Sequence, residues 1–156
     1  MSLNIMKSLQ FVSVIWLVLI AVSSELCAQG FVQRKQLTKQ LTETIDKVRN
    51  EKTLTSRTEA AERLATLTRG INPYKVDDTT LGEMVSLLET EEDSVRAWVA
   101  ASLGHLGLRA KVAAAPKLLK LLPEVDCLQG SLTSAPFIRV ALKRMREIPP
   151  APRNCG

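Results

Sequence analysis

The side chains best suited to chemistry lie in the second half of the chain, and they favour binding over catalysis. His105 is the single histidine, and neither a cysteine nor a base–nucleophile partner lies near it. Trp98 precedes it by seven residues, almost two helical turns, so both fall on one flank of a predicted helix. Phe137 and Arg144 repeat this spacing 39 residues later. Because tryptophan and arginine often anchor protein interfaces, we predict that Trp98, His105, Phe137 and Arg144 form a strip that binds another protein.

The two aromatic residues of this strip also have a simpler interpretation. In that alternative, Trp98 and Phe137 wedge between repeated helices as part of the hydrophobic core and bind nothing. The sequence leaves both interpretations open.

No pattern in the sequence predicts a metal, a cofactor or a catalytic site. Sites built from cysteine and histidine need several ligands at short spacings, which this chain lacks. The acidic segment from Glu89 to Asp93 lacks the alternating ligands and central glycine of a calcium loop, so we interpret it as a solvated turn. A glycine-rich phosphate loop is also missing. We therefore expect a protein that is not an enzyme and holds no cofactor or metal.

The first residues have the pattern of a secretory signal. Lys7 supplies a positive charge, and an uncharged apolar run follows from Phe11 to Val22, with Ala28 as the expected last residue before cleavage. A transmembrane helix needs about 20 apolar residues, so this run is short for one. We predict a signal peptide over residues 1–28 and a location in the periplasm or outside the cell. The alternative is an uncleaved anchor, which would tether the protein to a membrane.

Cleavage after Ala28 would leave two cysteines, Cys127 and Cys155. In an exported protein such a pair can oxidise, so we predict a Cys127–Cys155 disulfide, with two free thiols as the alternative. The closed loop of about 29 residues would stabilise the fold by roughly 3 kcal/mol in the chain-entropy model.

The net charge of +5 is concentrated in the C-terminal half, where ten basic residues stand against three acids between Arg96 and Arg153. Nucleic-acid binding would need aromatics interleaved with these bases, and after Trp98 at its start this stretch contains Phe137 alone. Together with export, this argues against nucleic acid as a partner.

Apolar residues at helical spacing predict the elements that position these side chains. Leu37, Leu41, Ile45 and Val48 form such a stripe in the first helix. The fourth helix follows a cap at Asp93 or Ser94 and ends at Gly107. The fifth contains Pro116, so we expect its regular part to start near Ala115. The six predicted helices cover residues 29–50, 56–68, 79–89, 94–106, 111–122 and 136–147.

The second helix of each pair repeats with a constant offset. Residues Arg57, Ala61, Leu64 and Leu67 recur 39 positions later as Arg96, Ala100, Leu103 and Leu106, and Leu142 and Met145 continue the series. A period near 40 in helical pairs is typical of HEAT-type repeats. Residues 93–107, DSVRAWVAASLGHLG, resemble the second helix of a HEAT repeat of the phycobilisome-lyase-like subgroup, with a turn acid, Val-Arg, small residues and a Leu-Gly-x-Leu-Gly end. Residues 113–122 resemble the proline-bearing first helix of the next unit.

The resemblance covers residues 81–122 well, 57–70 and 137–145 more weakly, and nothing before Gln29. It implies an all-α fold, a short superhelical solenoid of three HEAT-like pairs over residues 29–148, followed by a tail over 149–156. It also implies structural roles for two residues: Asp93 caps the fourth helix, and Arg96 pairs with a turn acid.

The function that this resemblance implies is protein binding by an exported adaptor or scaffold. One alternative is an immunity protein that inhibits a cell-wall hydrolase such as a peptidoglycan amidase. A bilin-lyase-like activity is the enzymatic alternative, although the repeat carries no catalytic residues with it. A homodimer through the apolar edges of the end helices is a further expectation.

Overall fold

The computed structural model describes residues 33–127 and 133–152, and these residues are helical with no strand among them. The predicted all-α fold class is therefore confirmed. The predicted signal peptide over residues 1–28 lies outside the described residues, as does Cys155. A compact unit comprises residues 38–156, and the helices described below pack within it.

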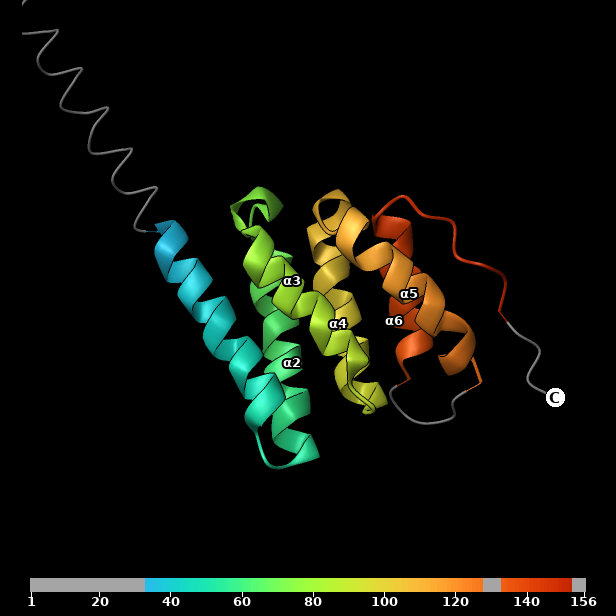
Figure 1. The fold of residues 1–156 in the computed structure, drawn as a ribbon, viewed down its shortest axis with the longest axis horizontal. Helices are drawn as coiled ribbons and strands as arrows, with labels where there is room; N and C mark the ends of the chain where they lie inside the picture. The colour runs from blue at the N-terminus through green and yellow to red at the C-terminus, as the bar shows by residue number, and fades with distance from the viewer. Residues whose placement is uncertain (1–32, 128–132, 153–156) are drawn as a thin grey trace, which may run out of the picture. The chain divides into compact units, whose positions relative to one another are not determined.

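The helices follow in the predicted order, joined by short turns (Figure 1). Residues 33–50 are helical and precede the labelled elements. The α-helices that follow are α2 (Leu54–Arg69), α3 (Asp78–Ser86), α4 (Asp93–Leu106), α5 (Lys111–Val125) and α6 (Ser134–Arg144). Three single-turn 3₁₀ helices lie between them, η1 (Pro73–Lys75), η2 (Leu87–Glu89) and η3 (Gly107–Arg109).

The predicted starts of α2, α4 and α6 were wrong. Thr53 caps α2 by accepting a hydrogen bond from the amide of Ser56 at 3.1 Å, so the helix begins two residues before the predicted residue 56. α6 begins at Ser134, two residues before the predicted Pro136. Glu92 is the N-cap residue of α4, and Asp93 is already the first helical residue. Asp93 therefore does not cap its own helix, because its carboxylate is used by a neighbouring one, as described below.

The fifth helix is longer than predicted, because both of its prolines lie inside it. α5 starts at Lys111 rather than Ala115 and continues through Pro123 to Val125. A proline inside a helix leaves the carbonyl four residues earlier without a helical donor. For Pro116 that residue is Val112, which is 90% exposed, so water can satisfy its carbonyl at little cost.

The helices α2, α4 and α6 lie beside one another, with α4 packed between the other two (Figure 1). Thr58 contacts Ser94 near the start of α2 and α4, at 3.0 Å, and Thr68 contacts His105 near their ends, at 3.3 Å. These two helices therefore run in the same direction. The helices α3 and α5 pack against each other as well.

Small side chains let α4 and α6 approach closely. Leu103 and Leu142 are fully buried, as the repeat pattern predicts, and they fill the core below the contact. At the contact itself, a Cβ atom added to Gly104 would lie 2.9 Å from the Cα and 3.0 Å from the Cβ of Ala141. Only glycine at position 104 allows this spacing of the two helices.

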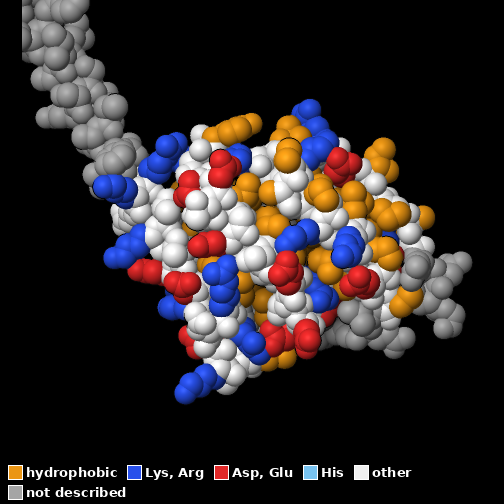
Figure 2. Space-filling model, in the orientation of Figure 1, with side chains coloured by type: hydrophobic (Ala, Val, Ile, Leu, Met, Phe, Trp, Pro, Cys, Tyr) orange, Lys and Arg blue, Asp and Glu red, His pale blue; other side chains and the backbone are white. Residues whose placement is uncertain are grey.

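The face that carries α3 and α5 is polar and mixed in charge. Acidic and basic side chains alternate across it, with hydrophobic ones between them (Figure 2). Lys117 of α5 pairs with Glu89 at 2.5 Å, and Arg109 pairs with Asp78 at 2.6 Å. Exposed pairs of this kind contribute little stability each, so this face is explained by solvation and pairing between neighbouring turns.

The close contact between α4 and α6 predicts opposite effects for two glycine substitutions. Gly104→Ala should destabilise the protein by about 1–3 kcal/mol, because the new Cβ meets backbone and the helices must separate. Gly82→Ala, in the middle of α3, meets nothing within 4 Å. It should stabilise the protein by about 0.5–1 kcal/mol through helix propensity alone. Urea unfolding of both variants measures this, and equal effects would contradict the contact.

Candidate functional site

The four residues of the predicted binding strip line one pocket between α4 and α6. The pocket has a volume of about 340 Å³. Trp98 and His105 come from α4, and Phe137 and Arg144 from α6, at positions equivalent in the repeat pattern. The pocket is also lined by Arg69, Ala101, Gly104, Pro136, Val140 and Ala141. The structure thus brings the four predicted side chains together in one pocket, along with six others.

The two aromatic rings form one end of the pocket. The centroids of the Trp98 and Phe137 rings are 5.6 Å apart, with their planes at 63°, which is an edge-to-face contact. Such contacts contribute about 0.5–1.5 kcal/mol beyond the buried area. Both residues are half-buried rather than buried, so part of each ring is free to contact a ligand. The rings therefore pack together, as in the core interpretation, and line the pocket as well.

His105 lies at the other end of the pocket and is held in one orientation. Its Nδ1 lies 2.9 Å from the carbonyl oxygen of Ala65 in α2, so this nitrogen carries the proton and donates it. Burial lowers the pKa of His105 below its usual value of 6.5, and the nearby guanidinium groups of Arg144 and Arg69 lower it further, while the Ala65 bond opposes them. In the neutral ring Nε2 is the remaining acceptor.

Two arginines from different helices flank this histidine. Arg69 is the last residue of α2 and Arg144 the last of α6, and both are exposed. Both line the pocket. Within the described part of the chain, neither arginine forms an ion pair and no acidic side chain lines the pocket. This end of the pocket is therefore positively charged.

Arg69 is a pocket residue that the sequence pattern missed. The repeat offset matches His105 to Thr66, and Arg69 lies one helical turn after Thr66. The fixed offset of 39 residues therefore does not include Arg69, although a residue one turn away lies on the same face of the helix.

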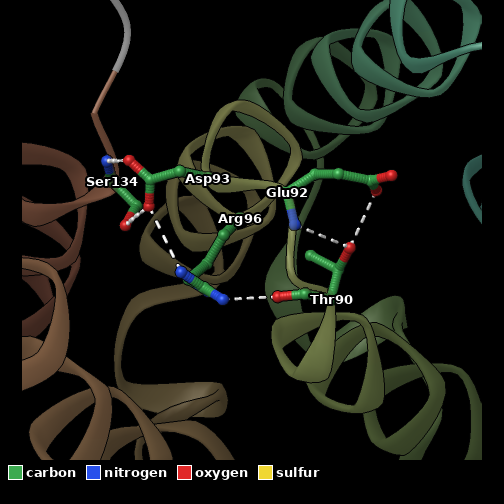
Figure 3. Close-up of polar contacts among 5 residues, drawn as sticks. All are labelled: Thr90, Glu92, Asp93, Arg96 and Ser134. Atoms are coloured by element: carbon green, nitrogen blue, oxygen red, sulfur yellow. Dashed lines mark hydrogen bonds and ion pairs between the residues drawn. The ribbon is translucent and has the colours of Figure 1, made fainter. Parts of the chain in front are cut away.

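Asp93 joins the start of α4 to the start of α6 (Figure 3). The amide of Ser134 donates to Asp93 Oδ2 at 2.8 Å, and the Ser134 hydroxyl donates to Oδ1. Ser134 is the first residue of α6, whose N-cap residue Thr133 makes no side-chain cap. Asp93 thus satisfies one of the free amides of α6 and places a negative charge at its positive end.

Arg96 fixes the turn that leads into α4. Its guanidinium donates to Asp93 Oδ1 at 3.3 Å and to the carbonyl oxygen of Thr90 (Figure 3). The expected pairing with a turn acid is therefore present. The Thr90 hydroxyl donates to Glu92 Oε2 at 2.9 Å, so the turn is closed by its own side chains.

The remaining predictions about the site concern metals, membranes and cysteines. Among the described residues, no group of three or more His, Cys, Asp or Glu side chains could hold a metal ion. Within the same residues, no helix combines the length and apolar character that crossing a membrane requires. Cys127 follows α5, and because Cys155 lies outside the described residues, their disulfide stays a prediction.

Comparisons with family models, with curated proteins and with solved structures find no match to this chain. Its function has to be argued from the pocket and from the residues that build it.

The lowered pKa of His105 predicts that the protein loses stability as the pH decreases. Because the unfolded chain binds the proton at a higher pH than the folded protein does, protonation favours unfolding. The stability contributed by neutral His105 is complete above about pH 6.5, and it is lost as the pH decreases toward the lower pKa of His105 in the folded protein. His105→Asn keeps an N–H donor for Ala65 and does not titrate. Urea unfolding at pH 7.5 and 5.0 should show a smaller loss for this variant, and equal losses would contradict the assignment.

The bond between Asp93 and Ser134 predicts a local effect on α6. Asp93→Ala should cost about 2 kcal/mol, because it removes a helix cap and the ionic partner of Arg96. Amide hydrogen exchange in the first turn of α6 should accelerate more than in α2. Glu91→Ala, at an exposed acid two residues away, should change stability by less than about 0.5 kcal/mol. If exchange accelerates equally in both helices, Asp93 does not cap α6.

Proposed function

We propose that this protein is an exported, non-enzymatic binding module of HEAT-like helical repeats, and that its α4–α6 pocket binds another protein. The observation that carries the proposal is the pocket itself. Side chains at equivalent positions of two repeats meet around one cavity of about 340 Å³, with half-buried aromatic rings at one end and free guanidinium groups at the other. Apolar pockets with a few placed polar groups are the usual binding sites of proteins.

The arrangement of the second helices supports the repeat architecture. Contacts between α2 and α4 join residues 36 and 37 positions apart at the two ends of the helices. Between α4 and α6, Asp93 bonds to Ser134, 41 positions later. Offsets near 40 are what stacked helical pairs of a HEAT-like solenoid would give.

The recurrence of arginine at equivalent positions of α2 and α4 is a second support. Arg57 and Arg96 occupy equivalent positions of α2 and α4, 39 residues apart. Arg57 pairs with Glu92, and Arg96 pairs with Asp93, so both guanidinium groups hold the turn that precedes α4. Arg57 thus links α2 to the turn of the next helical pair, whereas Arg96 binds the turn of its own pair, and together they tie the two pairs to each other.

Export and the disulfide are part of the same proposal. The signal-like residues 1–28 support export. Arg139 of α6 contacts both carboxylate oxygens of Asp126 at 2.7 Å and also donates to the carbonyl oxygen of Pro150. One guanidinium thus holds the residue before Cys127 and the tail that leads to Cys155. This proximity supports a Cys127–Cys155 disulfide, which the oxidising compartment reached by export would favour.

A pair of valine substitutions tests the binding pocket without disturbing the core. Val140 lines the pocket and is 48% exposed, while Val112 lies at the start of α5 and is 90% exposed. Val140→Asp should lower the affinity for the protein partner at least tenfold, because it places a charge in the apolar end of the site. Val112→Asp should leave the affinity unchanged.

The partner is captured with the tagged full chain from its own cells, and its affinity is measured after purification. A stoichiometric partner that is retained by Val112→Asp and lost by Val140→Asp supports the pocket. Retention by both variants would show that the partner binds elsewhere. A cell-wall hydrolase as the captured partner, inhibited when the purified protein is added, would favour the immunity-protein alternative.

A further inference from the structure

We infer that the α4–α6 pocket recognises an amphipathic helical segment of its partner, one that presents apolar side chains and, two helical turns away, a carboxylate. This inference rests on the proposed function and adds the chemistry of the partner. It is carried by the division of the pocket into an apolar end and a positively charged end.

The apolar end accepts side chains rather than charges. Trp98, Phe137 and Pro136 border it, and Val140 lies beside them with half of its surface exposed. The small residues at the α4–α6 contact form the base, so the hollow exists because no long side chain fills it. Leucine or phenylalanine side chains of a partner would bury apolar area against these groups.

The basic end calls for an anion. Arg69 and Arg144 both line the pocket together with His105, and the charge of each lowers the pKa of that histidine. Within the described residues, no carboxylate neutralises either group. Their position at the last residue of α2 and of α6 favours positive charge, because helix C-termini are negative. A favourable position at a helix end does not require both guanidinium groups to line the same pocket. Because they do, they create a site for a carboxylate.

The distance between the two ends matches two turns of a helical ligand. Trp98 and His105 are seven residues apart on α4, as are Phe137 and Arg144 on α6. At 1.5 Å per residue, the two ends lie about 10 Å apart along the helices. Residues i and i+7 of a partner helix span the same length on one face, so a helix lying in the groove would match both ends at once.

The test uses the full chain with Trp16→Phe, in which Trp98 is the sole tryptophan and its fluorescence reports on the pocket. The probe is an alanine-rich peptide of about 20 residues, long enough to be helical, with Leu at i, i+3 and i+4 and Glu at i+7. The matched peptide has Gln in place of Glu. We expect the Glu peptide to bind about tenfold more tightly than the Gln peptide, and added salt to reduce this difference.

Two double variants locate the charge effect. Arg69→Gln/Arg144→Gln should bind both peptides with the affinity that the parent has for the Gln peptide. The control Arg63→Gln/Lys143→Gln removes one exposed charge from each of the same helices, outside the pocket, and should keep the tenfold preference.

Several outcomes would overturn the inference while leaving the pocket as a binding site. Equal affinities for the Glu and Gln peptides would exclude recognition of a carboxylate. If both double variants lose the preference for the Glu peptide equally, that preference reflects general charge attraction. Equal binding of a peptide in which a central proline breaks the helix would exclude the helical ligand. If neither peptide binds but Val140→Asp still releases the captured partner, the pocket binds a different chemistry. If Val140→Asp retains the captured partner, the proposed function of the pocket is itself wrong.

Discussion

The close approach of Gly104 to Ala141 is the constraint on which the rest of this structure depends. A single added carbon at position 104 would lie 2.9 Å from the backbone of α6. At that spacing the rings of Trp98 and Phe137 reach each other, and Asp93 reaches the first amide of α6. Van der Waals contacts fall off steeply with distance, so a separation of even half an ångström would weaken all three contacts together. The pocket is therefore a consequence of helix packing.

The start of α4 is held by its neighbours rather than by its own residues. Glu92 makes no side-chain cap for its helix but pairs with Arg57 of α2, while Asp93 bonds to Ser134 of α6. The buried Nε atoms of Arg57 and Arg96 have no hydrogen-bond partner among the described residues, so this network also carries a desolvation cost. The network fixes the register of the helices, because each bond holds one helix at a set position along the axis of its neighbour. A solvated turn, as the acidic sequence suggested, would not do this.

Much of this arrangement could be predicted from the sequence, and the failures have a physical pattern. The repeat residues Ala100, Leu103 and Leu106 identified α4 and its buried face, because burial follows the helical period. The roles of Asp93 and Pro116 were wrong, because local rules place an acid at its own helix start and a proline in the first turn. Contacts between helices and access of water to a carbonyl override those rules. Neither can be read from neighbouring residues in the chain.

The packing of Trp98 against Phe137 leaves both rings partly exposed, so it does not by itself decide between core and interface. In this edge-to-face contact, the edge of one ring packs against the face of the other. The remaining surfaces of both rings stay half-exposed above a base of small residues. Because the rings are ordered by their mutual contact when the protein folds, a ligand would not have to immobilise them on binding. His105 is fixed in the same way by the carbonyl oxygen of Ala65. The same packing that stabilises α4 against its neighbours thus preorganises the pocket, and we therefore expect stability and the proposed binding to depend on one set of side chains.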